Sequence, residues 1–146
     1  MTVDLIALLA RARETGDASV LLDAIPYARF LGLSIRSEGG SPIASMQFAE
    51  HLVGDATIPA LHGGTLAALL ESTAILAVMI DPKTNAMPRT ITITIDYLRS
   101  GRAQRTDCRA RVVRQGRRVA VVATEAYQDD VDKSVVTAIV HLFVVE

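Results

Sequence analysis

The 146-residue sequence contains one cysteine, no tryptophan, and only three tyrosines and three phenylalanines. A single Cys108 excludes an internal disulfide and fits the reducing cytosol. The formal net charge of −1 leaves no basic excess of the kind that nucleic-acid-binding domains carry. The N-terminus, Met1-Thr2-Val3-Asp4, lacks the basic segment of a secretory signal peptide. We therefore expect a cytoplasmic protein without a nucleic-acid partner.

Metal-ligand spacing is also missing, because no His, Cys, Asp and Glu side chains cluster along the chain as zinc or iron ligands do. We expect neither a metal nor a separate cofactor. What is present is apolar: half of the residues are hydrophobic and 21% are charged. A chain of this length and composition can bury a real core, which excludes a disordered tail and predicts a folded domain.

The first third of the chain is predicted to form two short helices followed by two strands. Apolar residues at helical spacing predict a first helix capped by Thr2 and ending before Gly16, and a second helix over residues 18–24 stops at Pro26. Strands are predicted over residues 30–36 and 43–48, on either side of a glycine-rich turn. Residues 49–61 show no period and are predicted to be a loop.

A long apolar helix follows, from Gly63 to Ile80, and four strands follow the helix. The helix has about the length of a membrane span, but Glu71 at its middle indicates a core helix. The strands are predicted over residues 89–98, 104–114, 118–127 and 134–145. In the first of them, one face is predicted to carry Ile91, Ile93, Ile95 and Tyr97. The pattern predicts an α+β fold, in which a curved antiparallel sheet wraps around the central helix.

The start of this helix reads His62-Gly63-Gly64, and one carboxylate, Glu71, follows among leucines and alanines. Free N–H groups at a helix start attract negative charge, and glycines let a ligand approach the backbone closely. An oxyanion site beside a buried carboxylate suggests acyl transfer to water. The structural alternative, a tight loop with a glutamate that reaches the surface or an arginine, has similar weight on these residues alone.

Helix geometry places the carboxylate of this candidate site far from its backbone donors. Gly64 and Glu71 lie about 10 Å apart along an α-helix, whereas a general base and its oxyanion donors must reach one carbonyl-plus-water unit. Two helices facing each other across a two-fold axis would bring Glu71 of one chain to Gly63 and Gly64 of the other. We therefore predict a homodimer with two equivalent sites.

The chain resembles the hotdog-fold acyl-CoA thioesterases, within the PaaI-like and 4-hydroxybenzoyl-CoA thioesterase groups. The residues that carry the resemblance cover about four-fifths of the chain: Pro26, Phe30-Leu31-Gly32-Leu33, Ile58-Pro59-Ala60-Leu61-His62-Gly63-Gly64, Leu69-Leu70-Glu71, Thr90 to Arg99, and Gly116-Arg117. The division implied is an N-terminal helical extension over residues 1–25 and a hotdog thioesterase domain over residues 26–146.

The resemblance implies hydrolysis of an acyl- or aryl-CoA thioester to a free acid and CoA, with CoA only as part of the substrate. It places the catalytic acid at Glu71 and the carbonyl-polarising N–H at Gly63 or Gly64, beside His62. It places a water-holding hydroxyl at Thr90. In the family a polar residue often precedes the His-Gly-Gly motif, and its nearest match in this sequence is Asp55, displaced by one position. Homodimers, and possible homotetramers, follow from the same resemblance.

Several roles stay open at the level of sequence. Glu71 could act as a base or as a nucleophile, and His62 could be an oxyanion donor or a loop residue bonded to backbone. Arg114, Arg117 and Arg118 bracket a hairpin and could bind the phosphates of CoA, or they could form a solvated turn; Arg99 has the same ambiguity.

Two rival functions share the fold. A hydratase or dehydratase of acyl thioesters is disfavoured because its His-Phe-Pro type of signature is absent, with His51-Leu52-Val53 in its place. A non-catalytic acyl-CoA-binding module is disfavoured by Glu71, since such a module does not need an acid within an apolar helix.

Overall fold

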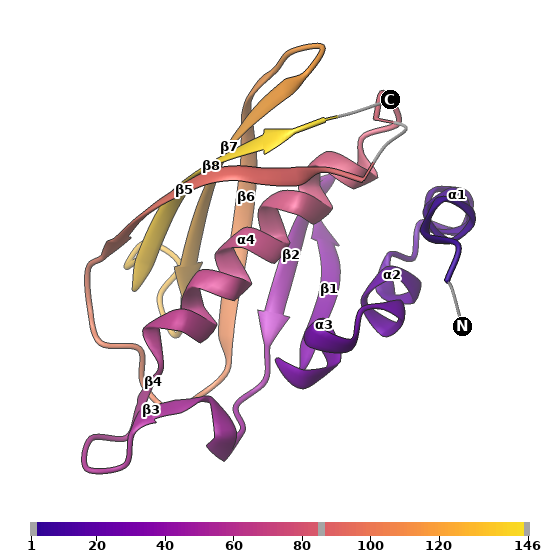
Figure 1. Cartoon of the computed structure of the whole chain (residues 1–146). Coiled ribbons are helices and arrows are strands. Elements are labelled where there is room, and N and C mark those ends of the chain that lie inside the picture. The colour runs from indigo at the N-terminus through magenta and orange to yellow at the C-terminus, as the bar shows by residue number, and fades with distance from the viewer. Residues whose placement is uncertain (1–2, 85–86, 145–146) are drawn as a thin grey trace.

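The computed structural model describes residues 3–84 and 87–144, in which a curved antiparallel sheet wraps around one long helix (Figure 1). This α+β arrangement confirms the predicted fold. The helices and strands, in chain order, are α1 (Leu5–Thr15), α2 (Ser19–Ala24), α3 (Pro26–Phe30), β1 (Leu33–Glu38), β2 (Ser41–Met46), the 3-10 turn η1 (Glu50–Leu52), β3 (Val53–Asp55), β4 (Ala60–Leu61), α4 (Gly63–Ile80), β5 (Arg89–Tyr97), β6 (Thr106–Gln115), β7 (Val119–Tyr127) and β8 (Val136–Phe143).

The main sheet has six strands in the order β1-β2-β6-β7-β8-β5, and all neighbours are antiparallel. β5 follows α4 directly, yet it pairs with β8, the last strand of the sheet. The two outer strands are therefore β1 and β5, and each has one side without a partner strand in the described chain. β3 and β4 form a separate small hairpin that leads into the start of α4.

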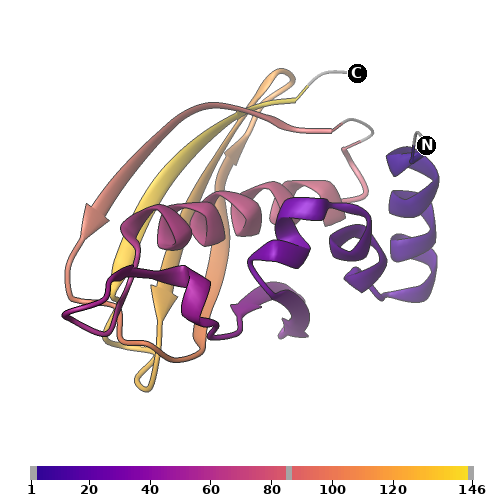
Figure 2. The same cartoon turned by 60° about the horizontal axis from the view of Figure 1, so that its bottom comes forward.

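The predicted Gly63–Ile80 helix is confirmed at both ends. It lies in the concave face of the sheet (Figure 2), and one side of it packs against buried residues of β2, β6, β7 and β8. Burying one leucine or valine side chain contributes about 1.5–3 kcal/mol, so this contact is the main source of stability. Its length and apolarity would also suit a membrane span, but most of its residues are buried inside the domain. It is the core helix that the position of Glu71 predicts.

The N-terminal helices pack against the C-terminal part of α4, from Ile75 to Met79. Leu9 and Ala12 of α1 and two leucines of α2 form a second core cluster with Leu76 and Met79 of α4. Asp4 caps α1 by accepting from the N–H groups of Ile6 and Ala7 at 3.1 Å. The cap predicted at Thr2 lies outside the described residues. These helices are thus part of the hydrophobic packing around the central helix.

Two stretches differ from the sequence predictions. Residues 26–30 form the helix α3, where the predicted strand was to begin at residue 30. Pro26 at its start has a φ already suited to the first turn, and Gly32, with φ +65°, reverses the chain into β1. The predicted loop over residues 49–61 contains η1 and the β3–β4 hairpin. Both pieces are too short to leave a hydrophobic period in the sequence.

A bulge changes the faces of β5. The register with β8 shifts between Thr90 and Thr92, so one extra residue interrupts the alternation. Ile93 and Ile95 face the core as predicted, but Ile91 is 52% exposed. The prediction that Ile91 shares a face with Ile93 and Ile95 was wrong. Tyr97 is also exposed, because it lies beyond the core at the start of α4.

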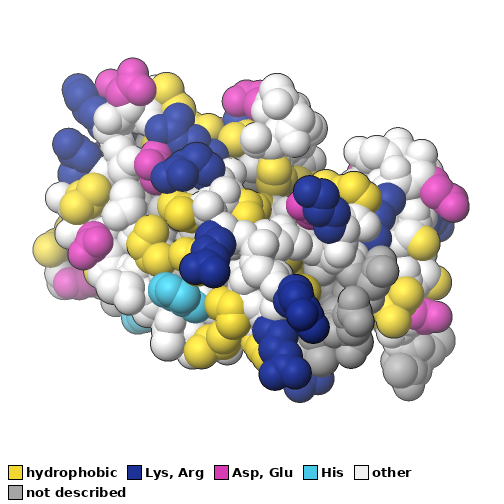
Figure 3. All heavy atoms as spheres, turned by 90° about the horizontal axis from the view of Figure 1, so that it is seen from above, with side chains coloured by type: hydrophobic (Ala, Val, Ile, Leu, Met, Phe, Trp, Pro, Cys, Tyr) yellow, Lys and Arg dark blue, Asp and Glu magenta, His cyan; other side chains and the backbone are white. Residues whose placement is uncertain are grey.

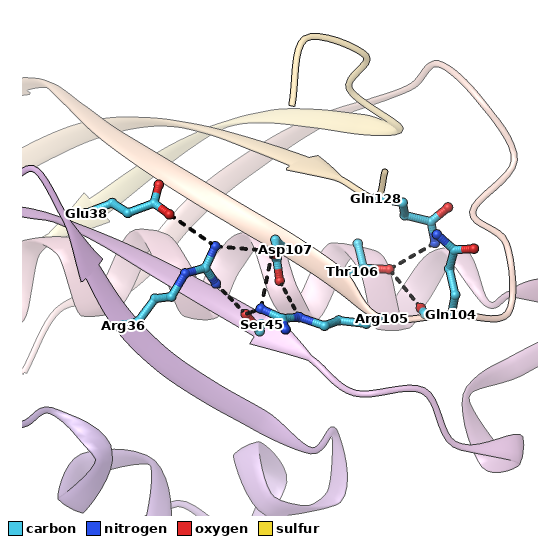
Figure 4. Close-up of polar contacts among 8 residues, drawn as sticks. All are labelled: Arg36, Glu38, Ser45, Gln104, Arg105, Thr106, Asp107 and Gln128. Atoms are coloured by element: carbon cyan, nitrogen blue, oxygen red, sulfur yellow. Dashed lines mark hydrogen bonds and ion pairs between the residues drawn. The ribbon is translucent and has the colours of Figure 1, made fainter. Parts of the chain in front are cut away.

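The outer face of the sheet carries a polar network that joins β1, β2 and β6 (Figure 4). The carboxylate of Asp107 receives hydrogen bonds from Arg36 and Arg105, and both arginines also donate to the hydroxyl of Ser45. Burial disfavours the ionised form of Asp107, yet the hydrogen bonds of Ser45 and Arg105 hold its pKa below the ordinary value. The network fixes the register of three strands on the side away from α4.

Candidate active site

The first turn of α4 leaves one backbone donor free. The Nδ1 atom of His62 accepts a hydrogen bond from the Gly64 N–H at 2.8 Å, so His62 caps the helix with its side chain. Because Nδ1 accepts, the ring proton of the neutral imidazole sits on Nε2. The N–H of Gly63 has no hydrogen-bond partner among residues 3–84 and 87–144. Of the two predicted donors, Gly63 is the available one.

Tyr97 lies against this turn and was not predicted to belong to the site. Its hydroxyl donates to the carbonyl oxygen of Gly63 at 2.9 Å. A Cβ atom on Gly63 would lie 3.2 Å from the Tyr97 ring, which explains the glycine at that position. Tyr97 therefore fixes the peptide between Gly63 and Gly64, which adjoins the peptide that carries the Gly63 N–H. It is 34 residues away in sequence, so no local pattern could have indicated the contact.

The β3–β4 hairpin supports His62 from the other side. The His62 N–H donates to the carbonyl oxygen of Leu52, and a Cβ atom on Gly54 would lie 2.9 Å from the Cα of His62. Asp55, the displaced polar candidate, is exposed, and its Oδ1 accepts from the N–H and hydroxyl of Thr57. These Thr57 hydrogen bonds lower the pKa of Asp55. Its carboxylate is thus ionised and tied into its own turn.

Glu71 lies on α4 eight residues after Gly63, or about 12 Å along the helix axis. Its side chain makes no hydrogen bond or ion pair with any residue of the described chain. The sequence predicted a buried carboxylate, but in a single chain Glu71 is half-buried. The structural alternative allowed Glu71 to pair with an arginine, but no arginine of the described chain forms an ion pair with it. Glu71 and the Gly63 N–H are both available, and one chain does not bring them together.

Thr90 lies at the far end of β5 from the turn that holds Gly63. It is seven residues from Tyr97, or about 23 Å along a strand, and it pairs with Leu142. Its hydroxyl is buried and has no hydrogen-bond partner in the described chain. One chain therefore does not place Thr90 beside Gly63, and its role in holding water stays a prediction.

The four predicted CoA arginines lie at two ends of the molecule. Arg99 follows β5 near the start of α4 and donates to the carbonyl oxygen of Ser134. Arg114, Arg117 and Arg118 lie in and beside the β6–β7 hairpin, at the end of the molecule where α4 stops. These three are exposed, and their side chains bond to no residue of the described chain. Figure 3 looks onto this end and shows Lys and Arg side chains spread across it.

The remaining histidines have structural contacts, as the sequence interpretation expected. His51 lies 2.8 Å from the carbonyl oxygen of Phe30, and His141 lies 3.2 Å from the hydroxyl of Thr92. Over the described residues, no three His, Cys, Asp or Glu side chains are grouped as a metal site would require. Cys108 is fully buried, and burial raises the pKa of its thiol to about 12, which makes it a poor nucleophile. The candidate reactive groups of the described chain thus remain Glu71 and the Gly63 N–H, both on α4.

Comparison with known proteins places this site in a family. The family model of the acyl-CoA thioesterase N-terminal domain matches residues 53–143, which is more than half of the chain and spans both Gly63 and Glu71. No curated protein matches the sequence.

Several solved structures are similar over most of their length. A protein of Chromobacterium violaceum is 32% identical, with 94% of this chain and 96% of that chain covered and a TM-score of 0.76. A phenylacetic acid degradation-related protein of Ralstonia eutropha is 28% identical, covering 86% and 98%, with a TM-score of 0.74. A variant of the phenylacetic acid degradation protein PaaI of Thermus thermophilus is 25% identical, covering 83% and 100%, with a TM-score of 0.69.

The resemblance predicted from the residues around His62 and Glu71 is therefore confirmed for the family, the fold and the thioester-hydrolase activity. The curved sheet around one apolar helix is shared with these relatives over most of their length. The chain belongs to the acyl-CoA thioesterase family and has the hotdog fold of PaaI-like thioesterases.

Proposed function

We propose that this enzyme hydrolyses acyl-CoA at a site made by two chains, with Glu71 of one chain acting on a carbonyl held by the Gly63 N–H of the other. One observation carries the proposal: both groups lack a partner among the described residues, and they lie about 12 Å apart along one rigid helix. Base and oxyanion donor must both reach the same thioester, so each needs a second copy of the chain.

The free edge of β5 supports this dimer. β5 is a nine-residue strand at the edge of the sheet, and long unpaired edges favour association with another strand. Exposed apolar side chains gather on it and just beyond it, namely Ile91, Tyr97 and Leu98. A two-fold axis beside β5 would place two α4 helices antiparallel, with Glu71 of each near the start of the other. A tetramer of two such dimers would keep every site intact.

Glu71 has two chemical routes. As a base, its carboxylate takes a proton from water, and the water oxygen bonds to the thioester carbon. The oxyanion formed accepts a hydrogen bond from the Gly63 N–H, and collapse of the intermediate breaks the carbon–sulfur bond. The proton held by Glu71 then neutralises the CoA thiolate, which leaves free acid and CoA. As a nucleophile, the Glu71 oxygen bonds to the carbonyl carbon itself, the carbon–sulfur bond breaks, and CoA leaves as its thiolate. Water then hydrolyses the resulting anhydride to the free acid and the Glu71 carboxylate, and the proton released neutralises the thiolate.

A single turnover in ¹⁸O-labelled water separates these routes. If water attacks the thioester directly, the label enters the acid product and Glu71 remains unlabelled. If Glu71 attacks and water then opens the anhydride at the glutamyl carbon, mass spectrometry of the Glu71 peptide finds the label in the enzyme. Label in the Glu71 peptide would establish the nucleophile, whereas label only in the acid is expected from the base and also from an anhydride that water opens at the acyl carbon.

The nucleotide end of CoA is proposed to lie on the partner subunit. Arg114, Arg117 and Arg118 lie at the end of the molecule opposite Gly63, so within one chain they are too far from the thioester. The antiparallel dimer brings the partner's hairpin to the same end as Gly63. There these unpaired guanidinium groups would bind phosphate, and Arg99 would contribute from the chain that holds Gly63.

The matched test compares a full acyl-CoA with a truncated thioester that ends at the pantetheine. We expect Arg117→Ala and Arg118→Ala to raise KM for the acyl-CoA about tenfold each, because a charged hydrogen bond contributes about 1.5–3 kcal/mol. KM for the truncated thioester should be unchanged. Arg11→Ala, at an exposed arginine of α1, is the control. Equal effects on both substrates would contradict phosphate binding and support the alternative that these arginines form a solvated turn.

The acyl group is proposed to be an aryl or medium alkyl chain. Only six aromatic side chains occur in the sequence, so the pocket must be lined mainly by aliphatic residues, which accept either shape. A panel of acyl-CoAs, with released thiol as the readout, tests this directly. The proposal predicts the highest kcat/KM within the aryl and medium-chain members. A preference for acetyl-CoA or for charged acyl groups would contradict it.

A further inference from the structure

The peptide that carries the Gly63 N–H is held at its other end by three hydrogen bonds. This peptide, the donor peptide, joins His62 to Gly63, so its carbonyl group belongs to His62. The His62 carbonyl oxygen accepts from the N–H of Thr65 at 3.0 Å, from the N–H of Leu66 at 3.3 Å and from the hydroxyl of Thr65 at 2.7 Å. The side chain of Thr65 is therefore bonded directly to the donor peptide.

The direction of the His62 carbonyl determines the direction of the Gly63 N–H. In a planar trans peptide the C=O and N–H bonds point to opposite sides. The His62 carbonyl points into the first turn of α4, toward Thr65 and Leu66, so the Gly63 N–H points away from the turn. Holding the carbonyl oxygen thus fixes the donor, which matters at a glycine because its backbone has the widest choice of conformations.

The hydroxyl bond of Thr65 is the contact that depends on the type of residue. Backbone bonds to the residue that caps a helix form at any helix start, whereas serine and threonine add a hydroxyl that reaches the carbonyl three residues earlier. Thr65 is only 9% exposed, so water competes little for this bond. A hydrogen bond at the carbonyl oxygen also makes the N–H of the same peptide a stronger donor, because linked hydrogen bonds polarise one another.

A second hydroxyl bond of this kind in α4 provides a comparison. Thr73 is fully buried, and its hydroxyl donates to the carbonyl oxygen of Leu69 at 2.7 Å. That carbonyl lies in the middle of the helix, where the N–H of the same peptide, on Leu70, has its ordinary helical partner. The side-chain contacts of Thr65 and Thr73 are therefore alike. What differs is the peptide they hold, since only that of Thr65 carries an N–H without a partner in the described chain.

We propose that Thr65 is a positioning residue for thioester hydrolysis, which orients and polarises the Gly63 N–H through the carbonyl of His62. The hydroxyl acts on the donor peptide and contacts neither the substrate nor the reacting carbon. When the oxyanion forms, the donor peptide is already aligned and needs no reorganisation. The inference rests on the proposed role of Gly63 and adds the side chain that prepares this donor before the substrate binds.

The first test compares Thr65→Val with Thr73→Val, each of which removes a hydroxyl and keeps the branched shape. For Thr65→Val we expect kcat to fall about tenfold at a nearly unchanged KM, because a group that acts through the donor must cost less than the 10²–10³-fold loss of an oxyanion donor. Thr73→Val should lower the Tm at least as much and leave kcat unchanged. Steady-state hydrolysis of acyl-CoA and calorimetry provide these values.

Thr65→Ser keeps the hydroxyl and should restore kcat to within about twofold of the wild type. If Thr65→Val does not fold, Thr65→Ala removes the same hydroxyl with a better helix former. Equal losses of kcat in the Thr65 and Thr73 variants, a loss that appears in KM alone, or failure of Thr65→Ser to restore kcat would each overturn the proposal.

A double variant separates this inference from the proposed function. Gly63→Pro has no N–H for Thr65 to act on, so adding Thr65→Val should lower kcat by less than about twofold more. If Gly63→Pro alone keeps full activity, the proposed oxyanion donor is wrong and the inference falls with it. If Gly63→Pro is impaired and Thr65→Val still lowers kcat about tenfold in that background, the donor stands and Thr65 does not act through it.

Discussion

The first turn of α4 keeps the Gly63 N–H without a partner in the described chain, whereas the last turn has the carbonyl oxygens of Met79 and Asp81 bonded to Arg13. Both ends of a helix leave backbone groups unsatisfied, so both need partners. At the start, His62 satisfies Gly64 and leaves Gly63 open to a ligand. At the C-terminal end of α4, Arg13 of α1 donates to the free carbonyl oxygens and so satisfies them.

This difference separates stability from chemistry along one helix. The closed end joins α1 to the core and should contribute to the free energy of unfolding. The open end keeps a donor unpaired, which costs stability in the free enzyme and is offset only when an oxyanion binds. Substitutions of the free donor and of Glu71 should therefore change kcat with little change in Tm, and substitutions at the closed end should do the opposite.

The largest effect is expected for Glu71→Gln, which keeps the shape of the side chain but can neither accept a proton nor attack. We expect kcat to fall about 10²–10⁴-fold at an unchanged Tm. Steady-state hydrolysis of acyl-CoA gives the rate and calorimetry gives the Tm. Glu50→Gln, at an exposed residue of η1, is the control and should behave as the wild type. Near-normal turnover by a folded Glu71→Gln enzyme would remove Glu71 from the mechanism.

Gly63→Pro is expected to lower kcat about 10²–10³-fold, because proline removes the free N–H of the turn. Proline is well tolerated at the first position of a helix, and His62 before it is extended, with ψ 132°, as a residue preceding proline must be. The neighbouring Tyr97 ring is the contact that must shift. Circular dichroism checks the fold. Full activity in a folded variant would exclude this N–H as the oxyanion donor.

Arg13→Ala tests the closed end and should lower the free energy of unfolding by about 1–3 kcal/mol, since buried carbonyl oxygens lose a charged donor. Measured at low substrate and without added acid, kcat/KM should change less than twofold. Urea denaturation provides the stability, and Arg13→Lys should recover part of it by restoring a charge near the helix end. A variant that loses activity but keeps its stability would reverse the assignment of the two ends.

The smallest effect is expected for His62→Ala, which removes the side-chain cap. Loss of a cap costs about 0.5–2 kcal/mol, and the Gly64 N–H becomes free to bind solvent or substrate. Because Gly63 keeps its donor, we expect kcat to fall less than tenfold. A loss as large as that of Gly63→Pro would instead give His62 a direct part in binding the oxyanion through Nε2.

Sequence patterns predicted both limits of α4, but they did not predict the contact that Arg13 makes with its last turn. The helix limits, the two glycines and the carboxylate are all local features, readable within 18 residues. The β strands that alternate over eight residues or more, such as β6, were also predictable from their period. Contacts made across long separations were not: Arg13 lies 66 residues from Met79, and Tyr97 lies 34 residues from Gly63.

Local exceptions account for the remaining errors. The bulge between Thr90 and Thr92 is set by pairing with β8, and an isolated strand sequence does not reveal it. The helix α3 has five residues, fewer than a hydrophobic period needs to be recognised. Asp4 replaces Thr2 as the cap of α1, since a helix terminus can be displaced by a residue or two without changing the apolar pattern.

The central claim, that each active site is shared by two chains, is tested most directly by mixing two inactive variants, Glu71→Gln and Gly63→Pro. Random exchange makes half of the dimers mixed, and in each of them one site carries both substitutions and the other carries neither. The account predicts recovery of about one quarter of wild-type activity. If native mass spectrometry shows complete exchange and the mixture remains inactive, every site keeps one substitution, and the shared site is contradicted.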